Sequence, residues 1–312
     1  MIKCLILGGT GFLGINLCKK LIDGGNEVSV FARNGGHAQR LCNLFPAVEF
    51  IGGDFSHKLD WDIMLKNIDV VFHLISTTNP SNKDLSYEFE SNVLPTINLL
   101  EGCKKNKVRV IYFSSGGTVY GMPRYLPIDE EHRTEPISAY GIHKLSIEKC
   151  IEYYGRTYGV DYYILRISNP YGAYQNPLGN QGVIAVFLAK ILQNKTVEIW
   201  GDGSTIRDYV FVDDLVSACM LLLSYVGGHR VFNIGSGRGY SLKEVIQLIK
   251  AKCGYSVNVN FVEKRIQDVS ANILDINLAR KELQWEPTVD LSEGLFRMVD
   301  MWSMQDKEFL FL

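Results

Sequence analysis

Residues Met1–Gly14 read MIKCLILGGTGFLG, and this stretch decides the fold. The apolar run from Ile2 to Leu7 predicts a buried strand, and the glycine-rich segment Gly8–Gly14 follows it at once. Apolar residues then recur at helical spacing as far as Ile22, which predicts a helix that ends at the glycine pair 24–25. A strand, a glycine turn and a helix in this order are typical of a phosphate-binding cradle.

Three glycines of this cradle have separate physical tasks. Gly8 permits a tight turn, Gly11 lets backbone N–H groups come close to a pyrophosphate, and Gly14 lets the helix pack closely on the strand. Turns need glycine in any case, so the G-x-x-G-x-x-G spacing gains its meaning from its place between a strand and a helix. The sequence therefore predicts a dinucleotide site that includes these glycines together with Phe12 and Leu13.

Length and composition narrow the functional classes. The 312 residues, of which 46% are hydrophobic, suffice for a real core and predict one large or two unequal domains. A formal net charge of -2 without a basic block argues against a nucleic-acid partner. The N-terminus has no secretory layout, and no apolar run approaches the roughly 20 residues that span a bilayer. The seven cysteines form no C-x-x-C, so we expect buried thiols in a reducing cytoplasm and no metal site.

Two positions beyond the first helix bear on the cofactor. The second strand, Glu27–Phe31, is not followed by the acid that bonds the ribose 2′-hydroxyl in many NAD-binding folds. Arg33 stands beside that place; helped by Arg40, it could bind a 2′-phosphate, and it could equally be a solvated arginine or stack on adenine. Beyond the third strand, Val48–Ile51, Asp54 either accepts from the adenine amino group or caps a helix. The predicted cofactor is NAD or NADP.

The next segments continue the alternation of strands and helices. Asp69–Ile75 and Val108–Phe113 are the fourth and fifth strands, and Ser76–Pro80 is a loop after the fourth. A helix is expected through Tyr87–Lys105, disturbed near Pro95. This order predicts an α/β fold, a Rossmann-type doubly wound parallel sheet with a smaller C-terminal α/β substrate domain. Ligands are then expected beyond the carboxyl ends of the strands.

Two segments at such ends carry reactive side chains. The fifth strand opens into Ser114–Gly121, SSGGTVYG, and the following helix carries Tyr140 and Lys144 on one face. A phenol with a reference pKa of about 10 is a poor base at neutral pH, but a nearby ammonium and a positive nicotinamide favour the phenolate. Any helix can contain Y-x-x-x-K by chance; after a glycine cradle and a Ser/Thr-rich strand end, the pair predicts a hydride-transfer site.

Taken together, these motifs resemble the extended short-chain dehydrogenase/reductases, and specifically the NAD-dependent nucleotide-sugar epimerase/dehydratase branch with its UDP-glucose 4-epimerases. The resemblance covers almost the whole chain. Its later parts are Leu165–Gly172, Gly201–Asp214, Asn233-Ile234-Gly235, Arg265-x-x-Asp268 and Leu283–Pro287.

The resemblance assigns ligand contacts to the second half of the chain. Asn169 occupies a position that contacts the sugar nucleotide. Arg207 and Arg265 occupy diphosphate-binding positions, where planar guanidiniums suit a pyrophosphate, although each alone could be a surface ion pair. Asn272, four residues beyond the Asp of Arg-x-x-Asp, either lines the pocket near the sugar C2 substituent or caps a turn. Ser115 is also placed in the predicted substrate site.

The resemblance also implies how the chain is divided and assembled. A homodimer is expected through the helices before Lys105 and after Ser138. The expected domains are a dinucleotide-binding Rossmann domain of residues 1–167 plus 208–234 and a nucleotide-sugar substrate domain of residues 168–207 plus 235–312.

The chain departs from the family pattern at the fifth strand end. Gly116 stands where the family usually has its catalytic Ser or Thr, so Thr118 is the nearest candidate for that hydroxyl, with Ser114 and Ser115 in reserve. The dehydratases carry an Asp-Glu pair at the positions of Gly117 and Thr118, and the related decarboxylases keep a Glu at the second of them. Both reactions are therefore disfavoured for this sequence.

The resemblance implies reversible 4-epimerisation of a UDP-hexose through a transient 4-keto sugar. The expected pair is UDP-glucose and UDP-galactose, and the N-acetyl forms of these sugars are possible further substrates. Tyr140 would take the 4-hydroxyl proton, Lys144 would bond the nicotinamide ribose, and Thr118 would hydrogen-bond O4. One rival is an NADPH-dependent nucleotide-sugar 4-reductase, which Arg33 favours. Another is a non-catalytic dinucleotide-binding regulator, for which Gly116 is the sole support.

Overall fold

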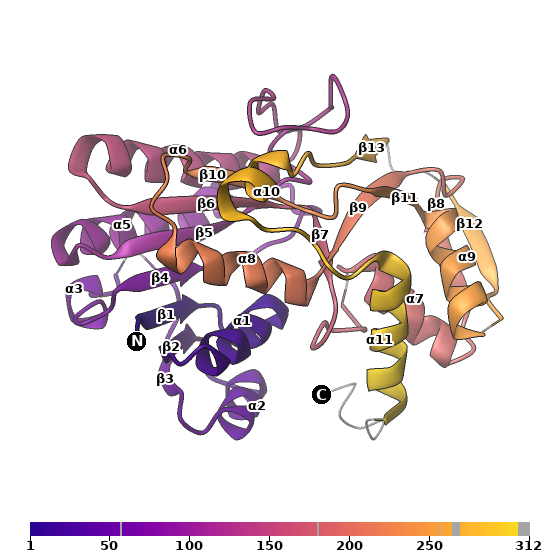
Figure 1. The fold of residues 1–312 in the computed structure, drawn as a ribbon, viewed down its shortest axis with the longest axis horizontal. Helices are drawn as coiled ribbons and strands as arrows, with labels where there is room; N and C mark the ends of the chain where they lie inside the picture. The colour runs from indigo at the N-terminus through magenta and orange to yellow at the C-terminus, as the bar shows by residue number, and fades with distance from the viewer. Residues whose placement is uncertain (57, 180, 255, 264–268, 305–312) are drawn as a thin grey trace. The chain divides into compact units, whose positions relative to one another are not determined.

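The computed structural model describes residues 1–312 except 57, 180, 255, 264–268 and 305–312. It divides the chain into two compact units, each drawn as a ribbon in Figure 1. The first unit comprises Met1–Gly121, Arg133–Arg166 and Cys219–Phe232, and the second comprises Met122–His132, Ile167–Ala218 and Asn233–Leu312.

The large sheet has seven strands in the order β10-β6-β5-β4-β1-β2-β3. Strand β1 lies inside it and pairs in parallel with β2 and β4, as do β2 with β3 and β4 with β5. This order, with crossover helices between the strands, confirms the predicted Rossmann-type class. The strands are β1 Lys3–Leu7, β2 Glu27–Ala32, β3 Glu49–Gly52, β4 Val70–His73, β5 Arg109–Ser115, β6 Tyr162–Ile167 and β10 Val231–Ile234.

Helices cover this sheet, which explains why β1 is apolar on both of its sides. Leu5 and Leu7 pack in one cluster with residues of α3, α5 and α6. Cys4 and Ile6 are equally buried and, by the alternation of a strand, face the opposite side, where α1 follows β1 (Figure 1). The helices here are α1 Phe12–Asp23, α2 Gly36–Leu44, α3 Trp61–Met64, α4 Leu85–Glu88, α5 Leu94–Asn106 and α6 Ala139–Tyr158.

The first helix has the limits that its glycines predict. Helix α1 begins after Gly11 and ends at Asp23, with Gly24 as its C-cap. Gly25 follows with a φ of +74°, a left-handed conformation that glycine adopts without strain. The structure therefore confirms the predicted strand–turn–helix unit, including the end of the helix at the glycine pair.

The helix expected over Tyr87–Lys105 is three segments in the structure. Helix α4 ends at Glu88, a π-helical segment η1 spans Phe89–Val93, and α5 starts at Leu94. Pro95 lies in the first turn of α5, which continues directly from η1, so its missing N–H leaves the helical hydrogen-bond pattern interrupted at this point. The disturbance that the sequence predicts near Pro95 thus takes the form of a π-helical turn before it.

The second unit is built on smaller sheets. Strand β9 pairs with β7, β11 and β13 in a four-stranded sheet, and β8 pairs with β12 in a two-stranded one. Its strands are β7 Asn169–Tyr171, β8 Val197–Trp200, β9 Ile206–Phe211, β11 Gly239–Ser241, β12 Val259–Val262 and β13 Ala271–Asn272. Its helices are α7 Val183–Leu192, α9 Leu242–Cys253, α10 Asn277–Leu283 and α11 Leu291–Met304, and α8 Val212–Ser224 runs from this unit into the first.

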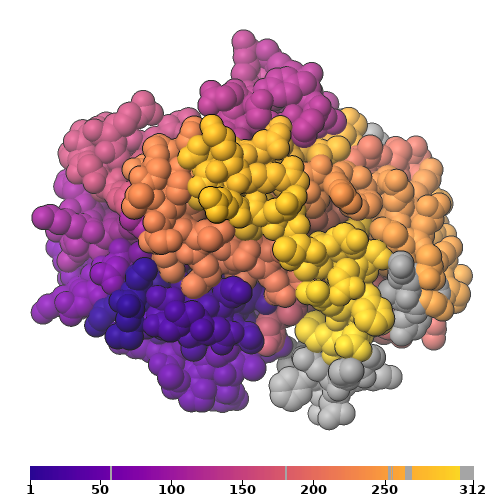
Figure 2. Space-filling model, in the orientation of Figure 1, coloured from indigo at the N-terminus to yellow at the C-terminus, as the bar shows by residue number. Residues whose placement is uncertain are grey.

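Helix α11 closes the core of the second unit. Leu295, Met298 and Trp302 belong to the apolar cluster formed with α7 and α9. Phe296, in contrast, is 52% exposed, and the yellow side chains of α11 are visible at the surface in Figure 2. The helix is therefore amphipathic, with one face in the core and one in solvent.

Two buried carboxylates join distant segments of the second unit. Asp214 accepts hydrogen bonds from the backbone and hydroxyl of Thr288, at 3.0 and 2.8 Å, and from Val289 N–H at 3.0 Å. Asp208 accepts from the backbone and hydroxyl of Ser236, both at 2.7 Å, and from Leu274 N–H at 3.2 Å. These acids belong to the conspicuous motif Gly201–Asp214 and have structural partners.

Candidate active site

The glycine cradle has the geometry that a dinucleotide needs. Gly8 has a φ of +86°, and a Cβ on Gly14 would lie 2.5 Å from the Gly8 carbonyl oxygen, so both positions require glycine. A Cβ on Gly11 would meet that oxygen at an ordinary 3.5 Å. The fold itself therefore does not need glycine at position 11, and the approach of a pyrophosphate to this glycine stays a prediction. Phe12 and Leu13 follow in the first turn of α1, half-buried, where N–H groups lack helical acceptors.

Sequence reasoning missed a fourth glycine of this turn. A Cβ on Gly9 would lie 2.6 Å from a methyl carbon of Val30 in β2. Any side chain there would push the turn away from the neighbouring strand. The need for this glycine depends on how β1 and β2 pair, and a glycine pattern along one segment does not show it.

The side chains expected near the adenosine follow the carboxyl ends of strands, as the glycine turn does after β1. Arg33 follows the end of β2 and is exposed, and Arg40 lies on α2. Asp54 is also exposed, two residues beyond β3. It does not cap the next helix, because Asp60 does so and accepts from Asp62 N–H at 3.0 Å. The helix-cap alternative for Asp54 is therefore wrong, and its adenine contact stays a prediction.

Tyr140 and Lys144 lie on α6, whose first turn is capped by the Ser138 hydroxyl. The Lys144 ammonium donates to the Phe113 carbonyl at 2.9 Å and lies 5.7 Å from the Tyr140 ring centre. Burial lowers the pKa of Lys144 to about 8, opposed by the charges of Glu148 and Glu88. The structure therefore brings this pair to the end of β5, with the lysine held by that strand.

The phenol of Tyr140 is a weaker acid in the protein than in water. Burial raises its pKa to about 12, a hydrogen bond from Ser76 lowers it, and the charge of Glu88 raises it. The protein alone therefore does not bring the tyrosine toward neutral pH, because burial is the largest effect on its pKa. The other contribution expected from the sequence is the positive charge of the nicotinamide.

The hydroxyls at the end of β5 and just beyond it have different contacts. The Thr118 Oγ1 is buried and has no hydrogen-bond partner among the described residues. The Thr118 carbonyl lies 2.9 Å from where a Cβ on Gly141 would be, which places this threonine beside the turn of α6 that carries Tyr140. Ser114 instead donates a short hydrogen bond to the buried Glu148, so it is unsuited to the reserve role. Ser115 is half-buried at the strand end.

A buried polar cluster beside the pair was not predicted. Glu88, fully buried, accepts hydrogen bonds from Thr78 at 2.6 Å, Asn82 at 2.9 Å and Asn92 at 3.1 Å. His143 Nδ1 lies 2.7 Å from the same carboxylate. The cluster therefore joins the loop after β4 to the helix that carries Tyr140 and Lys144.

The predicted substrate residues of the second unit lie on neighbouring strands. Asn169 in β7 is paired with Tyr209 of β9 and donates from its amide to the Asp208 carbonyl at 3.0 Å. Arg207 in β9 is paired in register with Asn272 of β13. Asn272 is 1% exposed and lies in a strand, so the turn-cap alternative for it is wrong.

Arg207 is partly engaged by the fold. Its Nη1 donates to the carbonyls of Ile206 at 2.8 Å and Val269 at 2.7 Å, and the side chain is half-buried. These bonds hold the guanidinium in one orientation. Arg265 lies outside the described residues, as does Asp268, from which the position of Asn272 is counted.

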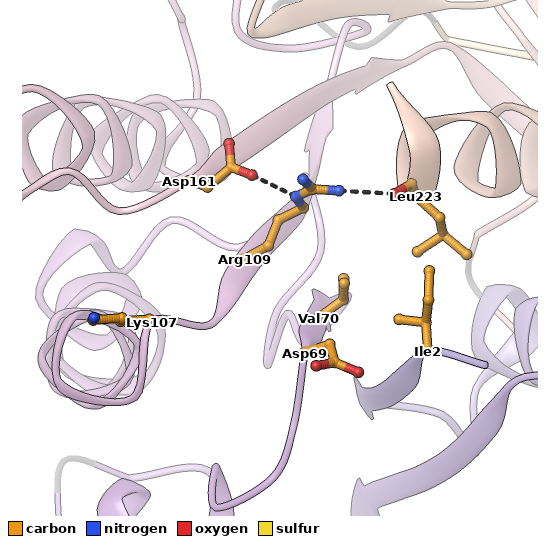
Figure 3. A pocket seen from close by; sticks show the side chains of 7 residues that line it. All are labelled: Ile2, Asp69, Val70, Lys107, Arg109, Asp161 and Leu223. Atoms are coloured by element: carbon orange, nitrogen blue, oxygen red, sulfur yellow. Dashed lines mark hydrogen bonds and ion pairs between the residues drawn. The ribbon is translucent and has the colours of Figure 1, made fainter. Parts of the chain in front are cut away.

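A pocket of the first unit lies at the amino ends of the strands, opposite the ends that carry the predicted site (Figure 3). Arg109 crosses it, donating to Asp161 at 2.5 Å and to the Leu223 carbonyl at 2.9 Å. The Asp69 carboxylate accepts from Lys3 N–H at 2.8 Å. Since these groups bind the amino ends of strands and the end of α8, we assign the pocket a structural role.

Comparison with known proteins decides the family. Residues 4–235 match the NAD dependent epimerase/dehydratase family. The chain belongs to this family. A putative UDP-glucose 4-epimerase of Methanocaldococcus jannaschii is 38% identical over 300 residues, covering 95% of this chain and 97% of the relative. A dTDP-4-dehydro-6-deoxyglucose reductase of Escherichia coli is 34% identical, covering 95% and 96%.

A solved structure agrees with this family membership. The UDP-glucose 4-epimerase of Thermotoga maritima, crystallised with UDP-glucose, has a TM-score of 0.91 and 34% identity, covering 97% of this chain and 99% of its own. The resemblance drawn from the sequence is thereby confirmed. NAD, one of the two predicted cofactors, is the cofactor of the family. The described part of the chain contains no helix that is long and apolar enough to cross a membrane.

Proposed function

We propose that this chain catalyses NAD-dependent 4-epimerisation of a UDP-hexose through a transient 4-keto sugar. The observation that carries the proposal is a set of three groups near the end of β5: the Lys144 ammonium bonded to the Phe113 carbonyl, the Tyr140 phenol on the same helix, and the buried Thr118 hydroxyl, which has no hydrogen-bond partner among the described residues. A base, a cation and a free hydroxyl are what removal of a proton from a sugar hydroxyl requires.

The three side chains would divide the work as follows. Tyr140, as phenolate, takes the proton of the sugar 4-hydroxyl and returns it at the end of the cycle. Lys144 binds the nicotinamide ribose and stabilises the phenolate by its charge. Thr118 donates its hydroxyl hydrogen to O4, where charge develops, which would give this buried hydroxyl the partner that the described residues do not supply.

The cofactor would lie on the glycine cradle. The turn at Gly8, Gly11 and Gly14 and the N–H groups of Phe12 and Leu13 would hold the pyrophosphate, and Asp54 and Arg33 would face the adenosine. Bound NAD supplies a hydride acceptor and then a hydride donor. Because no net redox occurs, the protein must keep its cofactor through the cycle.

The sugar nucleotide would be held by the second unit. Arg207, oriented by two carbonyls, is suited to the diphosphate, with Arg265 as its proposed companion. Asn169 would contact the nucleotide sugar and Asn272 would lie near its C2 substituent, and Ser115 of the first unit is a further proposed contact. We accordingly assign residues 1–167 plus 208–234 to the dinucleotide and residues 168–207 plus 235–312 to the substrate.

The decisive test uses the protein as purified. Incubated with UDP-glucose and no added NADH or NADPH, it should form UDP-galactose, and each molecule should turn over many times. The bound nicotinamide should be identified after release from denatured protein. If product forms only in proportion to added NAD(P)H, the epimerase assignment is wrong.

A specific observation supports a second candidate, an NADPH-dependent nucleotide-sugar 4-reductase. The Escherichia coli relative is named a dTDP-4-dehydro-6-deoxyglucose reductase. Its similarity extends over nearly the same share of both chains as that of the Methanocaldococcus jannaschii relative. Arg33 is exposed after the end of β2, and a guanidinium there could bind a 2′-phosphate. A 4-keto sugar nucleotide given with NADPH would distinguish it, since a reductase consumes one equivalent per product.

We further propose a cytoplasmic homodimer. Tyr87 on α4 and Leu94 at the start of α5 are 48% and 46% exposed, and Tyr153 and Tyr158 on α6 are 53% and 45% exposed. Exposed large apolar side chains on adjacent helices are typical of a contact with a second copy. Light scattering of the purified protein, with Tyr153→Glu as the disrupting variant, tests this.

A further inference from the structure

Glu88, the last residue of α4, is a fully buried acid to which the proposed reaction assigns no role. Helix α4 and the π-helical segment η1 that follows it both pack on α6, the helix that carries Tyr140 and Lys144. Turns of π-helix are frequent at functional sites. A buried carboxylate also needs donors for its oxygens, so the donors of Glu88 tell us which segments it joins.

On one side, the donors come from the loop 74–84, which connects β4 to α4. The Thr78 hydroxyl donates to Glu88 Oε2 at 2.6 Å, and the Asn82 amide donates to Oε1 at 2.9 Å. Both carboxylate oxygens are therefore bound to this loop. The loop could move away only by leaving a buried acid without two of its donors. It is thus held at the carboxyl end of β4, where ligands are expected in this fold.

The π-helical segment holds the same loop by a second route. The amide nitrogen of Asn92 donates to Glu88 at 3.1 Å and to the Thr77 hydroxyl at 2.9 Å. The amide oxygen of Asn92 accepts from the backbone N–H of Thr77 at 2.9 Å. The backbone of the loop is therefore fixed to the same buried cluster as its side chains.

On the other side, Glu88 contacts α6. His143 Nδ1 lies 2.7 Å from Glu88 Oε2, and neither side chain is exposed. Because a carboxylate can only accept, this contact is favourable with the imidazole hydrogen on Nδ1. Tyr140 lies three residues earlier on the same helix face, and its ring centre is 5.0 Å from that of His143, with the ring planes at 83°. The imidazole therefore contacts both the acid and the ring of the predicted base.

We propose that Glu88 is a positioning residue of the active site, which holds the loop 74–84 against the turn of α6 that carries Tyr140 and fixes the phenol ring through His143. It acts through these residues and is not itself a reacting group. The inference rests on the proposed function in one respect, that Tyr140 is the base. A base misplaced by about 1 Å can cost roughly a hundredfold in rate, so the contact should govern turnover more than substrate affinity.

The experiment combines two variants with a matched control. Glu88→Gln keeps the shape of the side chain and replaces an acceptor oxygen by an NH₂ group, which cannot accept from the loop or the helix. His143→Gln removes the ring that contacts Tyr140. Glu90→Gln, the control, makes the same change at an exposed acid two residues further along. For each variant and for the double variant, kcat and KM for UDP-glucose are measured at equal cofactor content and well below the melting temperature.

Amide hydrogen exchange provides a measurement that needs no activity. Peptides of residues 74–84 and 138–146 report on the loop and on the first turns of α6, and the first of them contains the Thr77 N–H that is bonded to Asn92. Glu88→Gln should accelerate exchange in both peptides, because it weakens the cluster that joins them. Glu90→Gln should leave both unchanged.

We expect Glu88→Gln to lower kcat roughly tenfold and to change KM by less than about twofold. His143→Gln should lower kcat to a similar extent. The double variant should lose about as much as the more affected single variant, and not the product of the two losses, because both residues act on Tyr140 through one contact. Thr78→Val removes one donor of the loop and should reduce kcat by a smaller factor, which keeps the test open if Glu88→Gln does not fold.

Three results would overturn the inference or separate it from the proposed function. If Glu88→Gln and Thr78→Val melt at lower temperatures but keep their kcat, the acid is merely structural. If the two single losses multiply in the double variant, His143 is not the link between Glu88 and Tyr140. If the unaltered protein does not epimerise UDP-glucose while Glu88→Gln still accelerates exchange in both peptides, the reaction assignment fails and the connection of loop and helix through Glu88 stands.

Discussion

The imidazole Nδ1 of His143 lies 2.7 Å from the carboxylate of Glu88, and neither side chain is exposed to solvent. Burial, followed by the charge of Lys144, lowers the pKa of His143 to about 3. In an unfolded chain the same pKa is about 6.5, so the unfolded state binds the proton first as the pH falls. Stability from this histidine is therefore complete above about pH 6.5 and is lost progressively below it.

His143→Gln should make the fold less sensitive to acid. Glutamine keeps a polar group beside Glu88 but does not titrate, so the variant avoids a loss of roughly 2 kcal/mol between about pH 6.5 and 5. Calorimetric melting over this range measures it, with the exposed His37→Gln as control. Equal slopes in all three proteins would show that His143 does not contribute to acid sensitivity.

Tyr140→Phe should lower turnover at least about a hundredfold, because it removes the base and keeps the ring. The ring contact with His143 at 5.0 Å should preserve the local packing. Turnover of UDP-glucose is compared at equal cofactor content, and circular dichroism checks the fold. A folded, cofactor-loaded variant with full turnover would exclude Tyr140 as the base.

Thr118→Val should lower turnover by a smaller factor than Tyr140→Phe and leave stability nearly unchanged, since the buried hydroxyl has no partner in the described part of the chain to lose. Ser114→Ala is the contrasting variant. It removes the bond to Glu148, which also holds Arg166 at 2.8 Å, and should lower the melting temperature. A silent Thr118→Val together with a damaging Ser115→Ala would move the O4 contact to Ser115.

Arg33→Ala tests the adenosine end of the cofactor site. If the guanidinium binds a 2′-phosphate, NADP should bind the cofactor-free protein at least as well as NAD, and the variant should lose roughly tenfold in NADP affinity with NAD unaffected. Calorimetric titration with both nucleotides measures this. A strong preference for NAD that Arg33→Ala leaves unchanged would make Arg33 a solvated side chain.

Asn272→Tyr tests the sugar end. Asn272 is buried beside Arg207, and a tyrosine ring there should suppress UDP-GlcNAc about tenfold more than UDP-glucose if the site faces C2. The ratio of kcat/KM for the two sugars is the measurement, and a melting curve verifies that the variant folds. Equal losses for both sugars would place Asn272 away from C2.

Much of the fold followed from local patterns. The first strand, its glycine turn and the end of α1 at Gly24 are confirmed, because strand apolarity, positive φ and helix capping act within a few residues. The family followed from motifs of the same kind. Tyr140 and Lys144 were found because four residues along one helix define a shared face.

The contacts between segments could not be found in this way. The need for Gly9 depends on β2 lying against the turn. Glu88 was not singled out because a lone acid in a helical stretch predicts a solvated face. Its burial follows from the loop that folds over it and from the π-helical turn that comes next.

The contact of Asp214 with Thr288 and Val289 sets a lower limit on the length of chain that can stand alone. A polypeptide cut before Thr288 would lose three donors to one buried carboxylate, and would end close to Trp285, whose indole N–H donates to the Asp214 carbonyl at 3.0 Å. The buried carboxylate of Asp214 would then lack the hydrogen-bond donors that it has in the intact chain. The segment from Trp285 to Val289 is thus bonded to the start of α8 through Asp214. We therefore expect a truncation before Thr288 to destabilise the fold.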